Sequence, residues 1–256
     1  MMNNGDAPLE LSFLASDESG PLYKVVERKI LQCLVDGEWK PGDRLPPENQ
    51  LAKRFGVAVS TVRAGVRNLA ASNVLTRRQG KGTFVTVHGR QPRFRFFNIH
   101  RNDGRTAQPS RRVIEFKSVV ADLHVARNLD LRGGSEERVF SFTLILEDGG
   151  TPAGFYDIFL PERRFAGLTK TDIQTTTGNM YGLYQERFGV NVVRTEERVS
   201  AIKASARIVS LLDLPADEPV LQIDRIAYTF NDEPVEFRRT IHESRMHHYL
   251  QKQGLD

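Results

Sequence analysis

The chain has 256 residues, of which 39% are hydrophobic and 27% are charged, and its formal net charge is +4. This composition excludes a low-complexity or disordered chain and suits one large or two modest domains. The single cysteine, Cys33, excludes an internal disulfide and a cysteine-based zinc site. It also fits a reducing compartment. Since no apolar run approaches the ~20 residues that span a bilayer, we expect a cytoplasmic protein with no membrane partner.

The charge is unevenly distributed along the chain. Residues 21–90 contain 13 Lys and Arg against 5 Asp and Glu, whereas the remaining residues contain 23 against 27. Contacts with phosphates supply much of the affinity of proteins for nucleic acid. A basic module beside a slightly acidic one therefore favours nucleic acid as the partner of the N-terminal part.

The N-terminal part begins without regular structure. Residues 1–20 lack hydrophobic periodicity, and we expect them to form a mobile tail. From Pro21 onward, apolar residues recur at helical spacing until Gly37. This stripe consists of Leu22, Val26, Ile30, Cys33 and Leu34.

Two short helical patterns follow within residues 41–85, joined by a tight corner at 56–59. The first buries Leu51, Ala52 and Phe55. The second presents the apolar stripe Val62, Val66, Leu69 and Ala70, places Ser60, Arg63 and Arg67 outward, and is expected to stop at Asn73. A basic hairpin comes next, with the turn Gly80-Lys81-Gly82. This order predicts a helix-turn-helix with a wing over residues 21–87, a shape that lies on duplex DNA.

The stretch resembles the winged-helix domain of the GntR family of bacterial transcription regulators. The residues that carry the resemblance are PLY at 21–23, PGDRLPPE at 41–48, LAKRFGV at 51–57, TVR at 61–63 and GKGTFV at 80–85. The resemblance implies double-stranded operator DNA as partner. The expected contacts are Asn49, Val59, Ser60, Thr61, Arg63, Arg67, Gly80, Lys81 and Gly82.

This chain departs from the family pattern at three positions. Ala58 and Val59 stand where a Ser-Arg pair is usual, and Asn49 replaces a frequent arginine. Ala58 also removes the usual helix N-cap, a loss of ~1 kcal/mol unless Ser60 or another group substitutes. An altered base preference follows from these departures. Loss of DNA binding is the alternative, and the retained wing and basic face argue against it.

A linker is expected at residues 88–95, and an α+β domain over 96–256. Strands are predicted at 111–120, 139–147, 153–160, 190–202, 220–230 and 234–242, with hairpin turns at 148–150 and 231–232. Helices are predicted at 121–131, 179–188 and 204–212, and a short irregular or helical piece at 161–168.

This half resembles the UTRA effector domain of the HutC subfamily, whose fold is shared with chorismate lyase. The matching runs are FLPERRFAGL at 159–168, LYQERFGV at 183–190, EERVSAIKAS at 196–205, LLDLPADEPVLQIDR at 211–225 and PVEFRRT at 234–240. The resemblance implies an α+β fold with an antiparallel sheet, a small-molecule effector, no cofactor and a homodimer.

Alternation along 234–242 places Glu236, Arg238, Thr240 and His242 on one face of the last strand. The resemblance implies that Glu236 lines the effector pocket. An edge-strand polar face is the alternative for Arg238 and Thr240. The expected effector contacts are Phe142, Leu144, Tyr156, Ile158, Glu236, Arg238 and His242.

Phe142, Thr143 and Leu144 stand where many members carry ligand-facing arginines. An apolar pocket wall offers a dianion no hydrogen bonds, so the free-energy cost of removing the dianion from water is poorly compensated. An arginine such as Arg238 or Arg225 can instead pair with a carboxylate. We therefore expect an organic acid or amino-acid-like metabolite rather than a sugar phosphate.

His242, His247 and His248 raise the question of a metal site. Their spacing of i, i+5 and i+6 matches no common helical ligand pair. We therefore expect no metal there, and a polar C-terminal segment or a dimer seam instead.

The function predicted is a ligand-responsive transcription regulator, most simply a repressor. A chorismate-lyase-like enzyme with a DNA-binding appendage is the alternative, kept by fold analogy alone. The strand-rich region 139–242 argues against a GntR protein with an all-helical sensor domain. A sensor domain of the aminotransferase type is excluded because the chain is too short for it.

Overall fold

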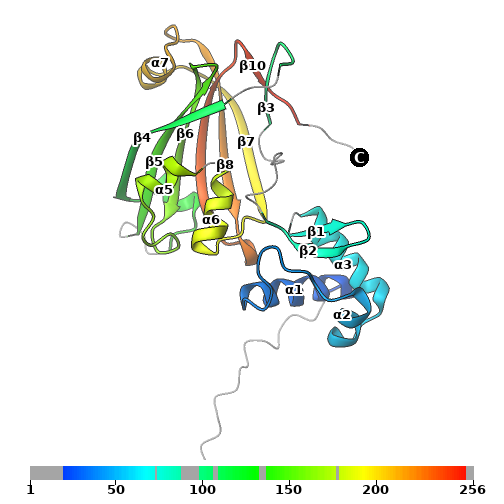
Figure 1. Ribbon diagram of the computed structural model, residues 1–256. Helices are drawn as coiled ribbons and strands as arrows, with labels where there is room; N and C mark the ends of the chain where they lie inside the picture. The colour runs from blue at the N-terminus through cyan, green and yellow to red at the C-terminus, as the bar shows by residue number, and fades with distance from the viewer. Residues whose placement is uncertain are drawn as a thin grey trace, which may run out of the picture. The chain divides into compact units, whose positions relative to one another are not determined.

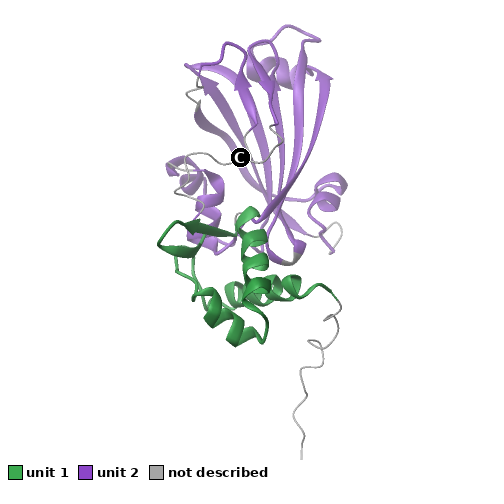
Figure 2. Ribbon diagram, turned by 90° about the vertical axis from the view of Figure 1, so that its right-hand side faces the viewer, with its two compact units in different colours: residues 1–86 green, residues 87–256 purple. Residues whose placement is uncertain are grey.

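The computed structural model describes residues 20–72, 74–87, 98–105, 109–132, 137–176 and 179–251. The chain forms two compact units, Met1–Thr86 and Val87–Asp256, coloured separately in Figure 2. The linker expected at 88–95, the helix stop expected at Asn73, and all of the expected N-terminal tail except Gly20 lie outside the described residues.

The first unit contains three helices and a β-hairpin: α1 (Leu22–Val35), α2 (Glu48–Phe55), α3 (Val59–Ala71), β1 (Leu75–Arg78) and β2 (Gly82–Val85). Strands β1 and β2 pair antiparallel. The predicted apolar stripes form the core, which includes Val26, Ile30, Leu51, Val62 and Val66, each at most 1% exposed. Helix α3 lies close to α1 at Gly65, where an added Cβ would be 3.0 Å from the carbonyl oxygen of Tyr23. This unit is the predicted helix-turn-helix with a wing.

The second unit is built on a six-stranded antiparallel sheet with the order β4-β5-β6-β9-β8-β7 (Figure 1). Its strands are β4 (Pro109–Val120), β5 (Arg138–Asp148), β6 (Thr151–Pro161), β7 (Arg194–Lys203), β8 (Pro219–Tyr228) and β9 (Pro234–Glu243). A separate two-stranded sheet pairs β3 (Ile99–Arg101) with β10 (His247–Tyr249). A single 3-10 turn, η4 (Phe230–Asp232), joins β8 to β9.

Helices pack on both faces of the large sheet. On one face, α6 (Met180–Phe188) and the buried Ile173 of α5 (Lys170–Thr175) join a core with Phe142 and Ile158. On the other face, α4 (Leu123–Asn128) packs near Phe237 and α7 (Ala206–Leu212) packs near Ile241. Consecutive residues of β9 therefore alternate between two buried layers.

Several sequence-based boundaries need correction. The strand expected from Val190 begins at Arg194, because Val190 and Val192 are buried in the α6 core as irregular chain. The helix expected over 121–131 is shortened to α4, and Asp130 then adopts a left-handed φ of 46°. Helix α5 and the strands β3 and β10 were not predicted.

The alternative of an edge-strand polar face for Arg238 and Thr240 is wrong. Strand β9 lies between β6 and β8 in the interior of the sheet. Arg238 is 1% exposed and Thr240 is 7% exposed. These polar side chains are therefore covered by the layer above the sheet and do not face solvent.

Candidate DNA interface and effector site

The outward side of α3 presents the residues that were expected to contact DNA. Val59 is 38% exposed, and Ser60, Arg63 and Arg67 are also exposed, whereas Thr61 is half-buried. Ala58 is the N-cap of α3 and makes no side-chain capping hydrogen bond. Among the residues that the structure describes, no side chain, that of Ser60 included, caps this helix. The helix therefore begins with uncapped N–H groups on the side that presents the basic residues.

One carboxylate connects α3 to the wing. Glu48, the first residue of α2, accepts hydrogen bonds from Arg63 Nε at 2.9 Å and from Arg77 Nη2 at 2.7 Å. Both arginines remain accessible, with side-chain exposures of 63% and 44%. Neighbouring Asn49 is exposed, and its side-chain oxygen accepts a bond from the Gln50 amide. The two cations are thus held on one side of the winged helix and stay open to a ligand.

The wing turn depends on its glycines. Gly80 has a φ of 68° and Gly82 a φ of 110°, both in the left-handed region. A Cβ on Gly82 would also lie 2.8 Å from Arg44 Nε. Lys81 between them is exposed. The turn therefore presents the Lys81 cation on a glycine backbone, with the Arg44 guanidinium beside Gly82. Glycines of this kind allow a backbone to approach a phosphate closely.

In the second unit, a buried polar network lies between the sheet and α6. The Glu236 carboxylate accepts bonds from Tyr184 at 2.6 Å, Arg238 at 2.8 Å and Tyr181 at 3.2 Å. Glu236 is 0% exposed. The Arg238 guanidinium carbon also lies 4.9 Å from the ring centre of Tyr156. The predicted residues Tyr156, Glu236 and Arg238 are therefore brought together, and Glu236 acts as the acceptor that orients its neighbours.

A second ion pair lies beside this network. Arg225 on β8 pairs in register with Arg238 on β9, so the two side chains share a face. Arg225 Nε donates to Glu197 Oε1 at 2.6 Å, and the Tyr249 hydroxyl donates to the other oxygen of Glu197 at 2.5 Å. Arg225 is 5% exposed, so this pair is also buried.

A third guanidinium comes from β4. Arg111 Nη2 donates to the Thr176 carbonyl at 2.6 Å. Burial, together with the nearby charge of Arg238, lowers the pKa of Arg111. Arg225 and Arg238 thus pair with the carboxylates of Glu197 and Glu236, and Arg111 adds a third guanidinium that bonds a backbone carbonyl. This excess of positive charge is suited to an anion.

The hydroxyl groups of the network remain donors at neutral pH. Burial, reinforced by the Glu236 carboxylate, raises the pKa of Tyr181 to about 12. The same causes hold the pKa of Tyr184 well above its ordinary value. Neither tyrosine supplies negative charge that would compete with an anion.

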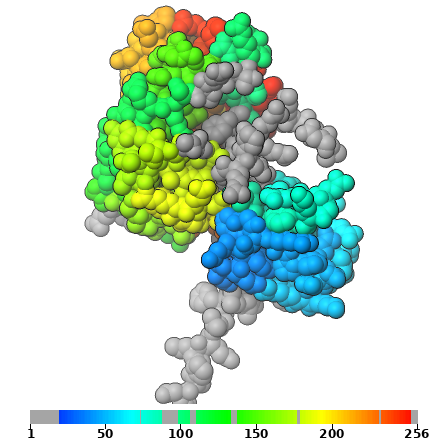
Figure 3. All heavy atoms as spheres, viewed as in Figure 1, coloured from blue at the N-terminus to red at the C-terminus, as the bar shows by residue number. Residues whose placement is uncertain are grey.

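The apolar residues expected to contact the effector are deeper than predicted. Phe142, Leu144 and Ile158 are at most 1% exposed and belong to the core beneath α6. Helices α5 and α6 form the surface over part of this face in Figure 3. The apolar wall expected there is present, and Arg225 and Arg238, the arginines expected to pair with a carboxylate, are joined by Arg111, which was not predicted.

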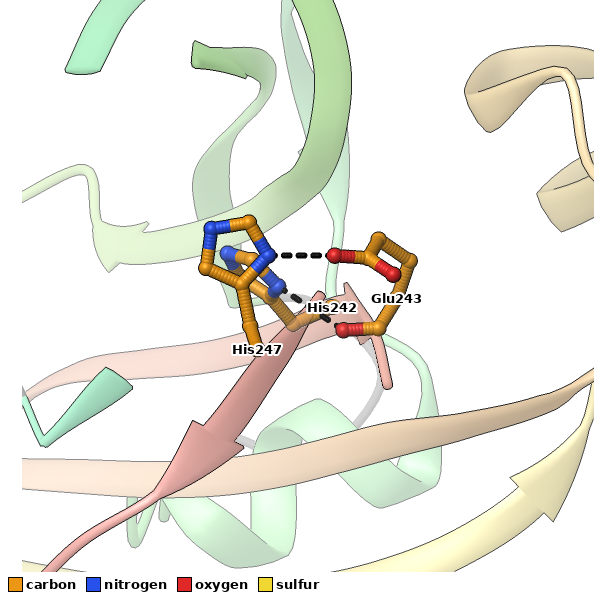
Figure 4. Close-up of side chains that lie close together, drawn as sticks. All are labelled: His242, Glu243 and His247. Atoms are coloured by element: carbon orange, nitrogen blue, oxygen red, sulfur yellow. Dashed lines mark hydrogen bonds and ion pairs between the residues drawn. The ribbon is translucent and has the colours of Figure 1, made fainter. Parts of the chain in front are cut away.

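The structure separates His242 from Glu236. The two residues share a face of β9 but lie six positions apart, about 20 Å along an extended strand. His242 instead contacts the residue that follows it and His247: its Nδ1 donates to the Glu243 carbonyl at 3.2 Å, and its ring centre is 4.5 Å from that of His247 (Figure 4). Burial lowers the pKa of His242 to about 4. Among the three histidines considered for a metal, His248 lies outside this cluster and bonds to Asn102.

A winged helix with exposed cations, followed by a domain with a buried cationic site, defines a one-component transcription regulator. The model of the bacterial regulatory proteins of the gntR family matches residues 22–85, and that of the UTRA domain matches residues 104–248. The chain belongs to the GntR family and carries a UTRA domain of the HutC type.

Known regulators align with most of this chain. The histidine utilization repressor of Pseudomonas putida is 31% identical over 89% of this chain and 90% of its own length. The "Probable fructoselysine utilization operon transcriptional repressor" of Shigella flexneri is 29% identical over 84% of this chain and 87% of its own. A solved ligand-binding domain assigned to the GntR family, from Bordetella bronchiseptica, aligns with a TM-score of 0.60 and 32% identity over 63% of this chain and 99% of that one.

These relatives settle the class of function. The chain is a ligand-responsive transcriptional repressor of the GntR family and not an enzyme. Regulators of this family bind operator DNA and take a small-molecule effector in the UTRA domain. In the part of the chain that the structure describes, no helix is long and apolar enough to cross a membrane.

Proposed function

We propose that this repressor acts in the cytoplasm as a homodimer on a near-palindromic operator and responds to a small carboxylate-bearing metabolite. The observation that carries the effector class is the group of three guanidiniums, of which Arg225 and Arg238 pair with carboxylates and Arg111 bonds a carbonyl. Dimerisation is proposed because one winged helix reads only a short half-site, and two-fold symmetry doubles the contacts. Sedimentation showing a monomer at micromolar concentration, with and without DNA, would refute the dimer.

The DNA contacts proposed are the exposed residues of α3 and the wing. Arg63 and Arg67 stand one turn apart on the outward side of α3, and Lys81 stands at the wing tip. An arginine on a recognition helix can bond guanine in the major groove, and a lysine on a glycine turn fits a phosphate. Asn49, Val59, Ser60 and Thr61 complete the proposed surface, together with Gly80 and Gly82.

Val59→Arg should change the operator that the protein prefers. Val59 is the first residue of α3 and is 38% exposed, so an arginine there extends outward without disturbing the core. The added guanidinium should favour a guanine at one position in each half-site. Selection of bound duplexes from a random pool, followed by sequencing, measures this preference.

Val35→Arg provides the matched control for that experiment. Val35 ends α1, is 50% exposed, and receives the same change of charge and size. Its selected operator should equal that of the wild type. An identical site for Val59→Arg and wild type would show that position 59 does not face a base.

The effector class is tested by a thermal-shift screen of organic acids, amino acids and phosphosugars on the full chain. A ligand that binds only the folded protein raises its melting temperature, by an amount that grows with concentration over Kd. We expect a carboxylate to stabilise the protein and to change its affinity for operator DNA. Tight binding of glucosamine 6-phosphate in calorimetry, with no response to carboxylic acids, would refute this effector class.

Arg111→Gln tests whether Arg111 binds the carboxylate that the thermal-shift screen identifies. Arg112→Gln is its matched control. Arg111 lies against Arg238 beneath the helices, whereas the Arg112 side chain is 61% exposed and pairs only loosely with Glu147, at 3.6 Å. Loss of one guanidinium from the anion site should weaken carboxylate binding by about tenfold or more. Equal affinities in the two variants would remove Arg111 from the site.

A further inference from the structure

The end of β9 gathers two histidines around one glutamate. After Glu243 the chain turns through Ser244, Arg245 and Met246 and returns as β10, whose first residue is His247. The amides of Arg245 and Met246 donate to Glu243 Oε2 at 2.8 and 3.0 Å. This turn brings His247 back beside His242, and their ring planes meet at 64°. His242, Glu243 and His247 are all buried.

The hydrogen bonds of the cluster fix the state of both rings. His247 Nδ1 bonds to Glu243 Oε1, and His242 Nδ1 bonds to the Glu243 carbonyl oxygen. Because both partners are acceptors, each Nδ1 carries a proton, and Nε2 is the nitrogen left to each ring for binding a metal. In Figure 4 the two Nε2 atoms point to the same side, away from Glu243. A carboxylate or carbonyl on Nδ1 is the usual outer partner of a metal-bound histidine.

A second carboxylate stands next to that side. Asp148, the last residue of β5, has an oxygen 3.5 Å from His247 Nε2, close to the roughly 3.4 Å between two ligands of a tetrahedral zinc ion. Arg101 also pairs with Asp148, and it has a further partner in Asp103. The oxygen near His247, Oδ2, is also the one that Arg101 bonds. Binding of a metal through Asp148 would therefore require Arg101 to move to the other oxygen of Asp148 or to rely on Asp103.

The surroundings leave room for the rings and for an ion. Gly154 on β6 stands opposite His242, and a Cβ there would lie 2.9 Å from the His242 ring and 2.6 Å from the Ile241 carbonyl oxygen. Only a glycine lets that ring lie against β6. A cavity of about 400 Å³ borders Asp148, Glu243 and His247 and provides a path from solvent.

We propose that His242 Nε2, His247 Nε2 and the Asp148 carboxylate bind one divalent ion of the zinc class, with Glu243 as the outer partner of both rings. Ligand atoms of His242, Glu243 and His247 lie within 4.8 Å of one another, which brings the two imidazoles together. Asp148 is outside that group, at 3.5 Å from His247 Nε2, and would move toward His242 to complete the site. Two imidazoles with a carboxylate suit zinc, nickel or cobalt, whereas calcium and magnesium prefer oxygen ligands. A water from the cavity completes the fourth position.

Such an ion would join three segments of the UTRA domain. Asp148 ends β5, His242 lies on β9, and His247 begins β10, which pairs with β3. The bound metal would therefore fasten the small β3–β10 sheet to the large sheet. This role is independent of the effector proposed for the arginine site, about 20 Å away along β9.

The test titrates zinc into untagged, chelator-stripped full-length protein by calorimetry. We expect one zinc per chain and a higher melting temperature with zinc present. Cobalt should give the visible absorption of a tetrahedral site with nitrogen ligands. Fewer than one zinc per chain in the wild type, or no cobalt spectrum, would overturn the proposal, whatever the variants do.

Variants locate the ion. His242→Ala, His247→Ala and Asp148→Asn should each weaken zinc binding by about tenfold or more. His248→Ala is the matched control: it removes the next histidine in the chain, which is exposed and bonds to Asn102, and it should bind zinc like the wild type. Circular dichroism shows which variants are folded. Loss of binding in His248→Ala, or full binding in a folded His247→Ala, would overturn the assignment.

Discussion

Replacing Glu236 by alanine is expected to lower the free energy of unfolding by about 3 to 5 kcal/mol, the usual loss when one partner of a buried ion pair is removed. Glu236 is 0% exposed and accepts three hydrogen bonds, from Arg238, Tyr181 and Tyr184. Without it, the charge of Arg238 stays buried beside Arg225 with less compensation. Glu236→Ala should therefore lower stability as well as any effector binding to which Glu236 contributes.

Urea denaturation followed by circular dichroism measures the effect. Glu115→Ala is the control: Glu115 lies on β4 of the same sheet, and its ion pair with Lys117 is about half exposed. Exposed pairs contribute little, so the control should change stability by less than about 1 kcal/mol. If Glu236→Ala unfolds at the same urea concentration as Glu115→Ala, the network of hydrogen bonds around Glu236 does not stabilise the domain.

The first unit was predictable because its signals are local. Apolar residues at helical spacing located α1, α2 and α3, and Gly56, which takes a φ of 69° after α2, marked the corner. Helix α5 also had a local signal that the sequence analysis did not use. Thr169 and Asp172 form a capping box at its start, the pattern of a hydroxyl residue followed three positions later by an acid.

The order of the strands in the sheet could not be predicted from the sequence. For that reason the proposed effector site was only partly predicted. Alternation along β9 correctly placed Glu236 and Arg238 on one face, but only the pairing of β9 with β6 and β8 shows that this face is buried. Arg111 was missed because β4 is separated from β9 by two strands in the sheet and by more than a hundred residues in the chain. Arg225 and Arg238 were expected as carboxylate partners, so Arg111 is the one cation of the three that only the strand order reveals.

The other large effect is expected in the winged helix, on its affinity for DNA. Arg63→Ala should weaken binding to the selected operator by about 1 to 3 kcal/mol in each half-site, counted twice in a dimer, and should relax specificity there. The side chain is 63% exposed and bonds only Glu48 among the contacts described, so its removal leaves the core intact.

Lys81→Ala should weaken binding to all duplexes alike and reduce the salt slope by about 1, because it removes a phosphate contact.

Both variants are compared by fluorescence anisotropy on the selected operator and on a scrambled duplex, over a range of salt concentrations. Arg28→Ala is the control, because Arg28 is an exposed cation on α1, outside the proposed surface. It tests whether net charge alone explains the loss. If Arg63→Ala weakens operator and scrambled duplex equally, as Lys81→Ala should, then Arg63 binds the backbone and the base reading lies with other residues of α3.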